Sequence, residues 1–155
     1  MAHWITAVGE QGQPLHCEAR VIRPLELVSH AIGAAGVSRL PAITQELVGA
    51  EKLWVGMTVL EPGARTGPHH HGDNETGVYL VAGWVRLRWG ARLESEAELE
   101  VGDLVFVPPH LPHEESNPSI DEPAVWVVVW GARQVYVPLE PDADGVYGEY
   151  PAKPS

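Results

Sequence analysis

The chain has 155 residues, which is the length of one ordinary domain and leaves no room for a second catalytic domain. Its 21 acidic residues outnumber the 10 lysines and arginines, so the formal net charge is -11 at pH 7. Phosphate backbones and anionic lipid headgroups repel a surface of that sign, which argues against nucleic acid and membrane surfaces as partners.

The number of cysteines and the N-terminal sequence indicate the cellular compartment of the protein. Cys17 is the only cysteine, so the chain cannot form an internal disulfide. The first residues lack a basic region followed by a long apolar run, and no apolar stretch approaches the length of a membrane span. We therefore expect a soluble, cytoplasmic protein.

Short apolar runs, broken by glycine and proline, predict an all-β fold. Glycine and proline breaks in residues 25–41 predict a loop or arm, and residues 43–48 are too few to decide between a helical turn and a strand. We expect one domain, with an N-terminal arm and the first strands in residues 1–52, the barrel core in 53–137 and an extended C-terminal arm in 138–155. The predicted strands are 53–60, 76–81, 84–89, a short strand that ends at 101, 104–107, a segment that returns from 113, 124–130 and 135–137.

Residues 63–83, GARTGPHHHGDNETGVYLVAG, are the most informative stretch. Successive side chains of a strand alternate between its two faces, so His69 and His71 point the same way and His70 points the other way. Glu75 follows a short turn that can return its carboxylate to the same place. Two neutral imidazoles and a carboxylate suit a divalent first-row metal.

A second stretch, residues 102–117, reads GDLVFVPPHLPHEESN. A short strand in it stops at two prolines, and His113 begins the segment that returns. His110 lies in the turn between them, where it is either a catalytic acid or base near the mouth of the site or a turn residue.

Together the two stretches resemble the two signature motifs of the cupin superfamily. The first motif has a glycine, five residues, His-x-His, three or four residues, a glutamate, six residues and a glycine. Seven residues rather than six lie between the glutamate and Gly83, and we expect a one-residue bulge near residues 76–77 to absorb the extra position. The residues that fit the motif are Gly63, His69, His71 and Glu75.

The second motif has a glycine, five residues, Pro-x-Gly, two residues, a histidine, three residues and an asparagine. His110 stands where a glycine is usual. The resemblance covers residues 53–130. The residues that fit are Gly102, Pro108, His113 and Asn117.

The resemblance implies a small antiparallel jelly-roll β-barrel. It also implies one divalent transition metal per subunit, held by His69, His71, Glu75 and His113, and a homodimer. Four ligands leave two positions of an octahedral metal open, which is typical of a catalytic site. Fe(II), Mn(II), Ni(II), Cu(II), Co(II) and Zn(II) all accept these ligands, so the identity of the metal stays open.

Aromatic residues are candidates for the wall of a substrate pocket. Trp54, Tyr79, Trp126 and Trp130 line an apolar cavity around the metal in one interpretation. In the other, they fill the barrel core or a dimer contact.

Three functional hypotheses follow. The first is a metal-dependent enzyme that acts on a small organic metabolite, with a dioxygenase-type oxidation by Fe(II) as the leading reaction. The second is a non-redox isomerase, lyase or cyclase, in which the metal polarises a carbonyl. The third is a small-molecule binding protein without catalysis, because the fold does not fix the function.

Overall fold

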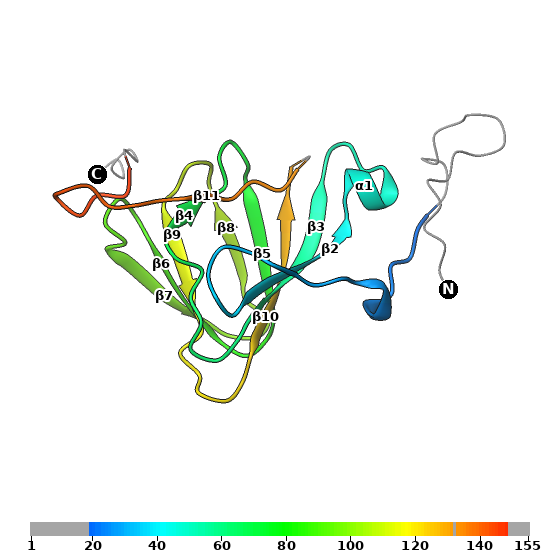
Figure 1. Cartoon of the computed structure of the whole chain (residues 1–155), viewed down its shortest axis with the longest axis horizontal. Coiled ribbons are helices and arrows are strands. Elements are labelled where there is room, and N and C mark those ends of the chain that lie inside the picture. Colours follow the sequence, from blue (N-terminus) through cyan, green and yellow to red (C-terminus); the bar gives the residue numbers. More distant parts are fainter. Residues whose placement is uncertain (1–18, 132, 149–155) are drawn as a thin grey trace.

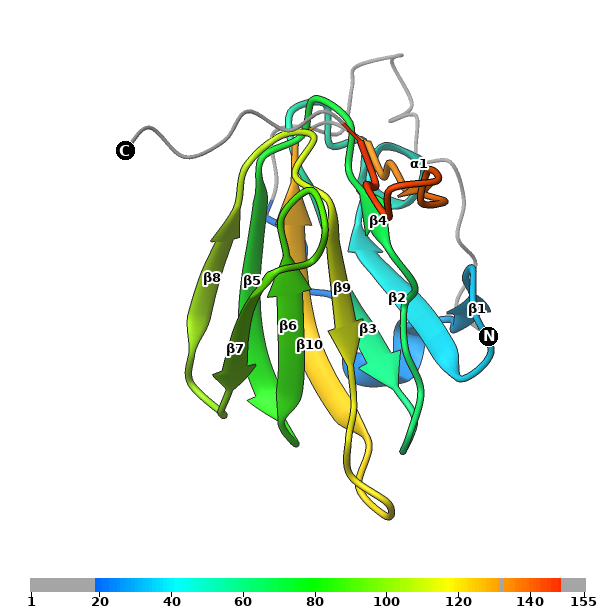
Figure 2. The same ribbon diagram turned by 90° about the vertical axis from the view of Figure 1, so that its left-hand side faces the viewer.

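A computed structural model describes residues 19–131 and 133–148 of the chain (Figure 1). Cys17 and the end of the predicted C-terminal arm, residues 149–155, lie outside this part. The described residues form two antiparallel β-sheets that face each other around one core (Figures 1 and 2). The predicted all-β fold, a jelly-roll barrel, is confirmed.

The larger sheet, sheet A, has six strands in the order β1-β2-β3-β10-β5-β8. Buried and less buried residues alternate along β3 and β10, because one face of the sheet covers the core. Its strands are β1 (His30–Ala31), β2 (Val37–Ile43), β3 (Trp54–Leu60), β5 (Thr76–Ala82), β8 (Leu104–Val107) and β10 (Ala124–Trp130).

The smaller sheet, sheet B, has five strands in the order β11-β4-β9-β6-β7. The predicted strand that ends at residue 101 is β7, which ends two residues earlier. Its strands are β4 (His69–His70), β6 (Val85–Trp89), β7 (Ser95–Leu99), β9 (His113–Ser116) and β11 (Val137–Pro138).

The loop predicted for residues 25–41 is wrong in its second half. β2 begins at Val37 and pairs with β3 along its length, with a register irregularity between Pro41 and Ile43. Proline lacks the backbone N–H that a ladder uses and is tolerated in a strand at such irregularities. The local sequence therefore resembled a break, whereas pairing with β3 makes it a strand.

Helical structure is confined to two short segments in the described residues, the 3-10 turn η1 (Pro24–Glu26) and α1 (Gln45–Val48). Thr44 caps α1, because its hydroxyl accepts a hydrogen bond from the backbone N–H of Leu47 at 3.1 Å. The sequence left a helical turn and a strand open for residues 43–48, and the structure shows the helical turn. Neither segment has the length and apolar character that a transmembrane helix needs.

The core fills the space between the sheets with side chains of inward-facing strand positions. Each of the largest of these contributes about 1.5–3 kcal/mol by leaving water. The part of the core at β4 and β9 holds buried polar side chains, among them His69 and His113. The buried residues of the apolar cluster are Val37, Trp54, Leu60, Leu80, Val85, Ala124, Trp126, Val128 and Trp130.

The chain after β10 crosses over the end of the barrel and lies against sheet B (Figure 1). β11 pairs with β4, so that Val137 lies opposite His70. Further on, the N–H of Tyr147 donates to the carbonyl of Ala91 at 2.7 Å. The segment after β10 is therefore held at two places on the smaller sheet, beside β4 and at the turn between β6 and β7.

Candidate metal centre

Two neighbouring strands of sheet B bring three histidines together. His69 on β4 pairs directly with His113 on β9, and His71 follows β4 on the same face as His69. The ring centroids are 4.3 Å apart for His69 and His113, 4.9 Å for His69 and His71, and 5.0 Å for His71 and His113. All three side chains are buried, and one nitrogen of each lies within 4.8 Å of the others. We call these residues the histidine trio.

The hydrogen bonds of the trio decide which nitrogen carries the proton. Each Nδ1 lies against a backbone carbonyl: His69 against Gly67 at 2.8 Å, His71 against Val135 at 2.7 Å, and His113 against Leu111 at 2.8 Å. A carbonyl only accepts, so each Nδ1 donates its proton and each Nε2 presents a lone pair. The Nε2 of His113 is buried and has no hydrogen-bond partner among the described residues.

Burial keeps His69 and His71 neutral. Desolvation, together with the positive charges of neighbouring groups, lowers the pKa of His69 well below its usual range. The same causes lower the pKa of His71 to about 3. Metal ligation requires the unprotonated imidazole, so no proton has to be removed from these two side chains at neutral pH before they bind a metal.

A buried carboxylate, that of Glu115, lies beside the trio. Its Oε2 is 3.7 Å from His69 Nε2, and its Oε1 is 3.6 Å from His113 Nε2. Thr66 fixes the carboxylate by donating its hydroxyl to Oε2 at 2.9 Å. The neutral Nε2 atoms and the carboxylate oxygens are all acceptors, and acceptors that face one another are stabilised by a cation among them. The donor set therefore fits a divalent transition metal.

Glu75, the carboxylate predicted as a ligand, is not brought to the trio. Its side chain is exposed, whereas the next residue, Thr76, is buried and pairs with Trp130. Four residues separate His71 from Thr76 and six separate Thr76 from Gly83, so Thr76 takes the place that the motif gives to glutamate. The Thr76 hydroxyl is buried without a partner in the described part of the chain.

The bulge that the motif spacing predicted is present in β5, but not near residues 76–77. The register between β10 and β5 shifts between Val125 and Trp126, which pair with Ala82 and Leu80, so Val81 is the extra residue. From Thr76 to Leu80 the pairing is regular. This regular stretch is what turns Thr76 inward and leaves Glu75 outside.

His70 and His110 form a second pair at the rim of the barrel, outside the trio. Their ring centroids are 5.4 Å apart, and His110 Nε2 lies 2.6 Å from an oxygen of Asp73. His110 has a positive φ of 59°, a backbone region in which glycine is favoured, so it does replace the glycine of the motif. Within the described part of the chain, His110 does not contact the trio.

The aromatic candidates divide between the two faces of sheet A. Trp54 and Trp126 point inward and are buried, and Trp54 contacts Trp130 with ring centroids 4.8 Å apart. Tyr79 is 44% exposed on the outer face and lies outside the interior that holds the trio. It faces outward because it alternates with the buried Leu80 along β5.

Two residues near the trio, Glu115 and Tyr136, were missed from the sequence, whereas Trp130 was a candidate for the cavity wall. Glu115 lies two residues after His113 and shares its face of β9, so the period of two was the available signal. Trp130 contacts His71 with ring centroids 4.8 Å apart. Tyr136 stacks on His69 at 4.7 Å, but nothing local marks a residue in the segment after β10 as a neighbour of β4.

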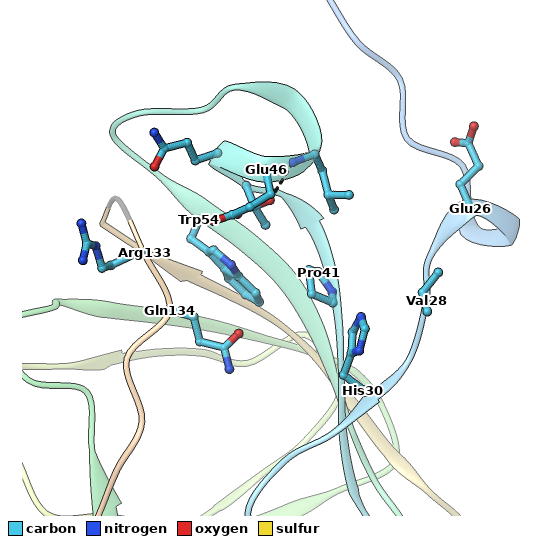
Figure 3. A pocket seen from close by; sticks show the side chains of 11 residues that line it. Glu26, Val28, His30, Pro41, Glu46, Trp54, Arg133 and Gln134 are labelled. Atoms are coloured by element: carbon cyan, nitrogen blue, oxygen red, sulfur yellow. Dashed lines mark hydrogen bonds between the residues drawn. The ribbon is translucent and has the colours of Figure 1, made fainter. Parts of the chain in front are cut away.

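A cavity of about 780 Å³ lies between α1, β2 and the segment after β10, and Figure 3 shows the side chains around it. Trp54, His30 and Gln134 line it, and the trio does not. Two rings in contact lie between the cavity and the trio, because Trp54 contacts Trp130 and Trp130 contacts His71.

The comparisons with known proteins agree with this geometry. Residues 56–130 match the family model described as Cupin domain. No curated protein sequence matches the chain. The solved structure of the polyketide cyclase RemF from Streptomyces resistomycificus superposes with a TM-score of 0.70 and 17% identity, covering 83% of this chain and 90% of that chain.

Two further solved structures are similar. A sugar phosphate isomerase of the cupin superfamily from Silicibacter pomeroyi has a TM-score of 0.62 and 21% identity, covering 82% of this chain and 90% of that chain. A predicted oxalate decarboxylase from Thermotoga maritima has a TM-score of 0.62 and 18% identity, covering 74% of this chain and 100% of that chain. At these identities the likeness concerns the fold.

Two facing antiparallel sheets with a buried group of potential metal ligands define a jelly-roll barrel with a candidate metal centre. With the sequence match, the class becomes specific: the chain belongs to the cupin superfamily.

Proposed function

We propose that this cupin is an enzyme that depends on one divalent transition metal per subunit, held by His69, His71, His113 and Glu115. The observation that carries the proposal is the convergence of neutral Nε2 lone pairs on a buried carboxylate. Glu115 takes the role that the sequence assigned to Glu75, because regular pairing in β5 gives the inward position to a threonine.

The bound metal supplies a Lewis acid that polarises a substrate oxygen. The residues of the chain position the ligands: backbone carbonyls hold the imidazoles in one tautomer, and Thr66 holds the carboxylate of Glu115 in place. The aromatic side chains of Trp130 and Tyr136 exclude water and suit a planar or unsaturated substrate.

The reaction that we favour is a non-redox isomerisation, lyase reaction or cyclisation of a small carbonyl-bearing metabolite. The names of two similar structures, a polyketide cyclase and a sugar phosphate isomerase, support this choice. A dioxygenase reaction is the second candidate, because imidazole and carboxylate ligands also suit Fe(II). His110 stays a candidate for proton transfer at the rim through its contact with Asp73.

The test is turnover of carbonyl-bearing metabolites by metal-loaded protein, in air and under strict anaerobiosis. We expect turnover that persists without oxygen, is abolished in His71→Ala and is retained in His70→Ala, the matched variant on the other face of β4. Turnover that stops without oxygen would establish the dioxygenase. A ligand that binds metal-loaded protein and is recovered unchanged would establish a binding protein instead.

A homodimer is part of the proposal, formed through the outer face of sheet A. The outward positions of the adjacent strands β8, β5 and β10 are apolar, and Leu104 and Phe106 are 79% and 64% exposed. An apolar face spread over several strands is typical of a protein interface, and a twofold axis lets a second copy cover it with the same face. The tryptophans of the interior do not take part.

Sedimentation analysis of the wild type and of Phe106→Glu tests the dimer. We expect a dimer that the buried glutamate converts to a folded monomer, whereas Leu25→Glu, at an exposed position in η1 and on none of these three strands, leaves the dimer intact. A monomeric wild type would remove this part of the proposal.

The single cysteine, Cys17, supports the cytoplasm as the proposed location.

A further inference from the structure

A buried arginine, Arg39, faces the same interior as the trio. It lies on β2 opposite Thr58, and only 4% of its surface is exposed. Its Nε donates to the Thr58 hydroxyl at 3.3 Å, and its guanidinium lies over the ring of Trp130, 4.5 Å from the ring centroid. Its Nη1 is buried and has no hydrogen-bond partner in residues 19–131 and 133–148.

A buried guanidinium is normally paired, because it stays charged at neutral pH and an unpaired charge in an apolar interior is costly. Burial lowers the pKa of Arg39 to about 10, so the side chain remains a cation. The ion pairs of the described residues use other partners. Hydrogen bonding by Thr58 and contact with Trp130 hold the guanidinium in place without neutralising it.

The charged and titratable groups around Arg39 belong to the metal centre. The positive charge of Arg39 contributes to lowering the pKa of His69, and the negative charge of Glu115 partly offsets the lowering of the pKa of Arg39. Glu115 does not neutralise the guanidinium by contact, because its oxygens face Thr66, His69 and His113. The interior thus holds a fixed cation, and its Nη1 has no acceptor among the described residues.

We propose that Arg39 is the anion-binding residue of the substrate site, and that Nη1 donates to a carboxylate or another anionic oxygen of the substrate. Arginine suits this role because its planar donors match a carboxylate, and the aromatic ring under it leaves its edge available. The substrate class is therefore a small organic acid with an unsaturated or planar body that packs beside Trp130. The inference rests on the proposed metal centre only for the position of the reacting group.

The experiment measures binding of acetate and benzoate, each beside its neutral amide, to metal-loaded and metal-free protein by calorimetry. In Arg39→Met we expect the affinity for both carboxylates to fall about 10- to 100-fold, as for loss of a charged hydrogen bond, with no change for acetamide and benzamide. Metal content should not change. Arg92→Met, which removes an exposed arginine in the turn between β6 and β7, should bind as the wild type does.

Two readouts separate a binding role from a structural one. Removal of an unpaired buried charge should leave the melting temperature of ligand-free Arg39→Met equal or higher, while carboxylates no longer raise it. Arg39→Lys keeps the charge but loses the planar donors, and its carboxylate affinity should be intermediate. If Arg39→Met does not fold, the carboxylate affinity of Arg39→Lys is compared with that of the wild type instead.

Unchanged carboxylate affinity in Arg39→Met, or in Arg39→Lys where only that variant folds, would overturn the inference. So would a wild type that does not prefer the carboxylates to their amides. Failure of the metal centre has a different signature: no metal is bound, yet metal-free protein still binds carboxylates through Arg39. The two proposals therefore fail separately.

Discussion

The histidines form two groups. The trio faces the interior of the barrel, whereas His70 and His110 lie at the rim, and the two groups differ in which ring nitrogens are free to bind a metal. In the trio each Nδ1 donates to a carbonyl, so the Nε2 lone pairs are available inside the barrel. At the rim, His70 Nδ1 accepts a hydrogen bond from the N–H of Gly72, so its proton lies on Nε2, and His110 contacts the carboxylate of Asp73. Neighbours in sequence thus acquire opposite tautomers because their backbone partners differ.

The largest expected effect is on metal affinity when a histidine of the trio is removed. His113→Ala should lower the affinity for Zn(II) or Co(II) by at least about 100-fold, because it deletes a direct ligand. Titration calorimetry measures the metal affinity, and circular dichroism checks that the barrel remains folded. His70→Ala is the matched control. Equal losses in both variants would abolish the distinction between the two groups.

The carboxylate beside the trio should have the next largest effect. Glu115→Gln keeps the shape of the side chain but removes its charge, and we expect metal affinity to fall about 10- to 100-fold. Glu75→Gln should bind metal as the wild type does, because the Glu75 side chain is exposed. If instead the Glu75 variant loses metal and the Glu115 variant does not, the ligand assigned by motif spacing is the correct one.

The pH dependence of stability should also separate the groups. The folded-state pKa of His71 is about 3, below its ordinary value of 6.5, so the unfolded state binds more protons between these values. Metal-free protein should therefore be most stable above pH 6.5 and lose up to about 1.4 kcal/mol per pH unit for each such histidine as the pH falls toward 3. Urea unfolding from pH 4 to 8 measures it.

His71→Ala should flatten this pH profile in the acid range, because its side chain no longer takes up a proton on unfolding. His30→Ala, at an exposed position on β1, should keep the wild-type slope. Stability that rises as the pH falls would contradict burial as the cause of the lowered pKa.

The smallest effect is expected at the rim. His110→Gly removes a side chain that is more than half exposed and relieves a positive φ, while it deletes the contact with Asp73. These contributions oppose each other, so the free energy of unfolding should change by less than about 1 kcal/mol. Metal affinity should not change. A large loss of turnover with normal metal content would instead place His110 in the reaction.

Much of the fold and part of the site were predictable from the sequence. The strand pattern predicted an all-β fold, the resemblance to cupins implied the jelly-roll barrel, and the period of two placed His69 and His71 on one face with His70 on the other. Strand β2 was not predictable, because Pro41 marks a break in the local sequence and only its pairing with β3 makes it a strand. Tyr79 stayed open between the cavity wall and a core or dimer contact, since the pattern within β5 does not say which face covers the core.

The amino-acid sequence by itself determined the kind of donors and their spacing, because strand periodicity is a local property of the backbone. The tertiary structure decided which carboxylate joins the histidines. That choice depends on the register of β5 against β10, because regular pairing from Thr76 to Leu80 turns Thr76 inward and leaves Glu75 outside. It also decided that Arg39 is buried without an acidic partner, because burial results from the packing of two sheets and from no pattern within one strand.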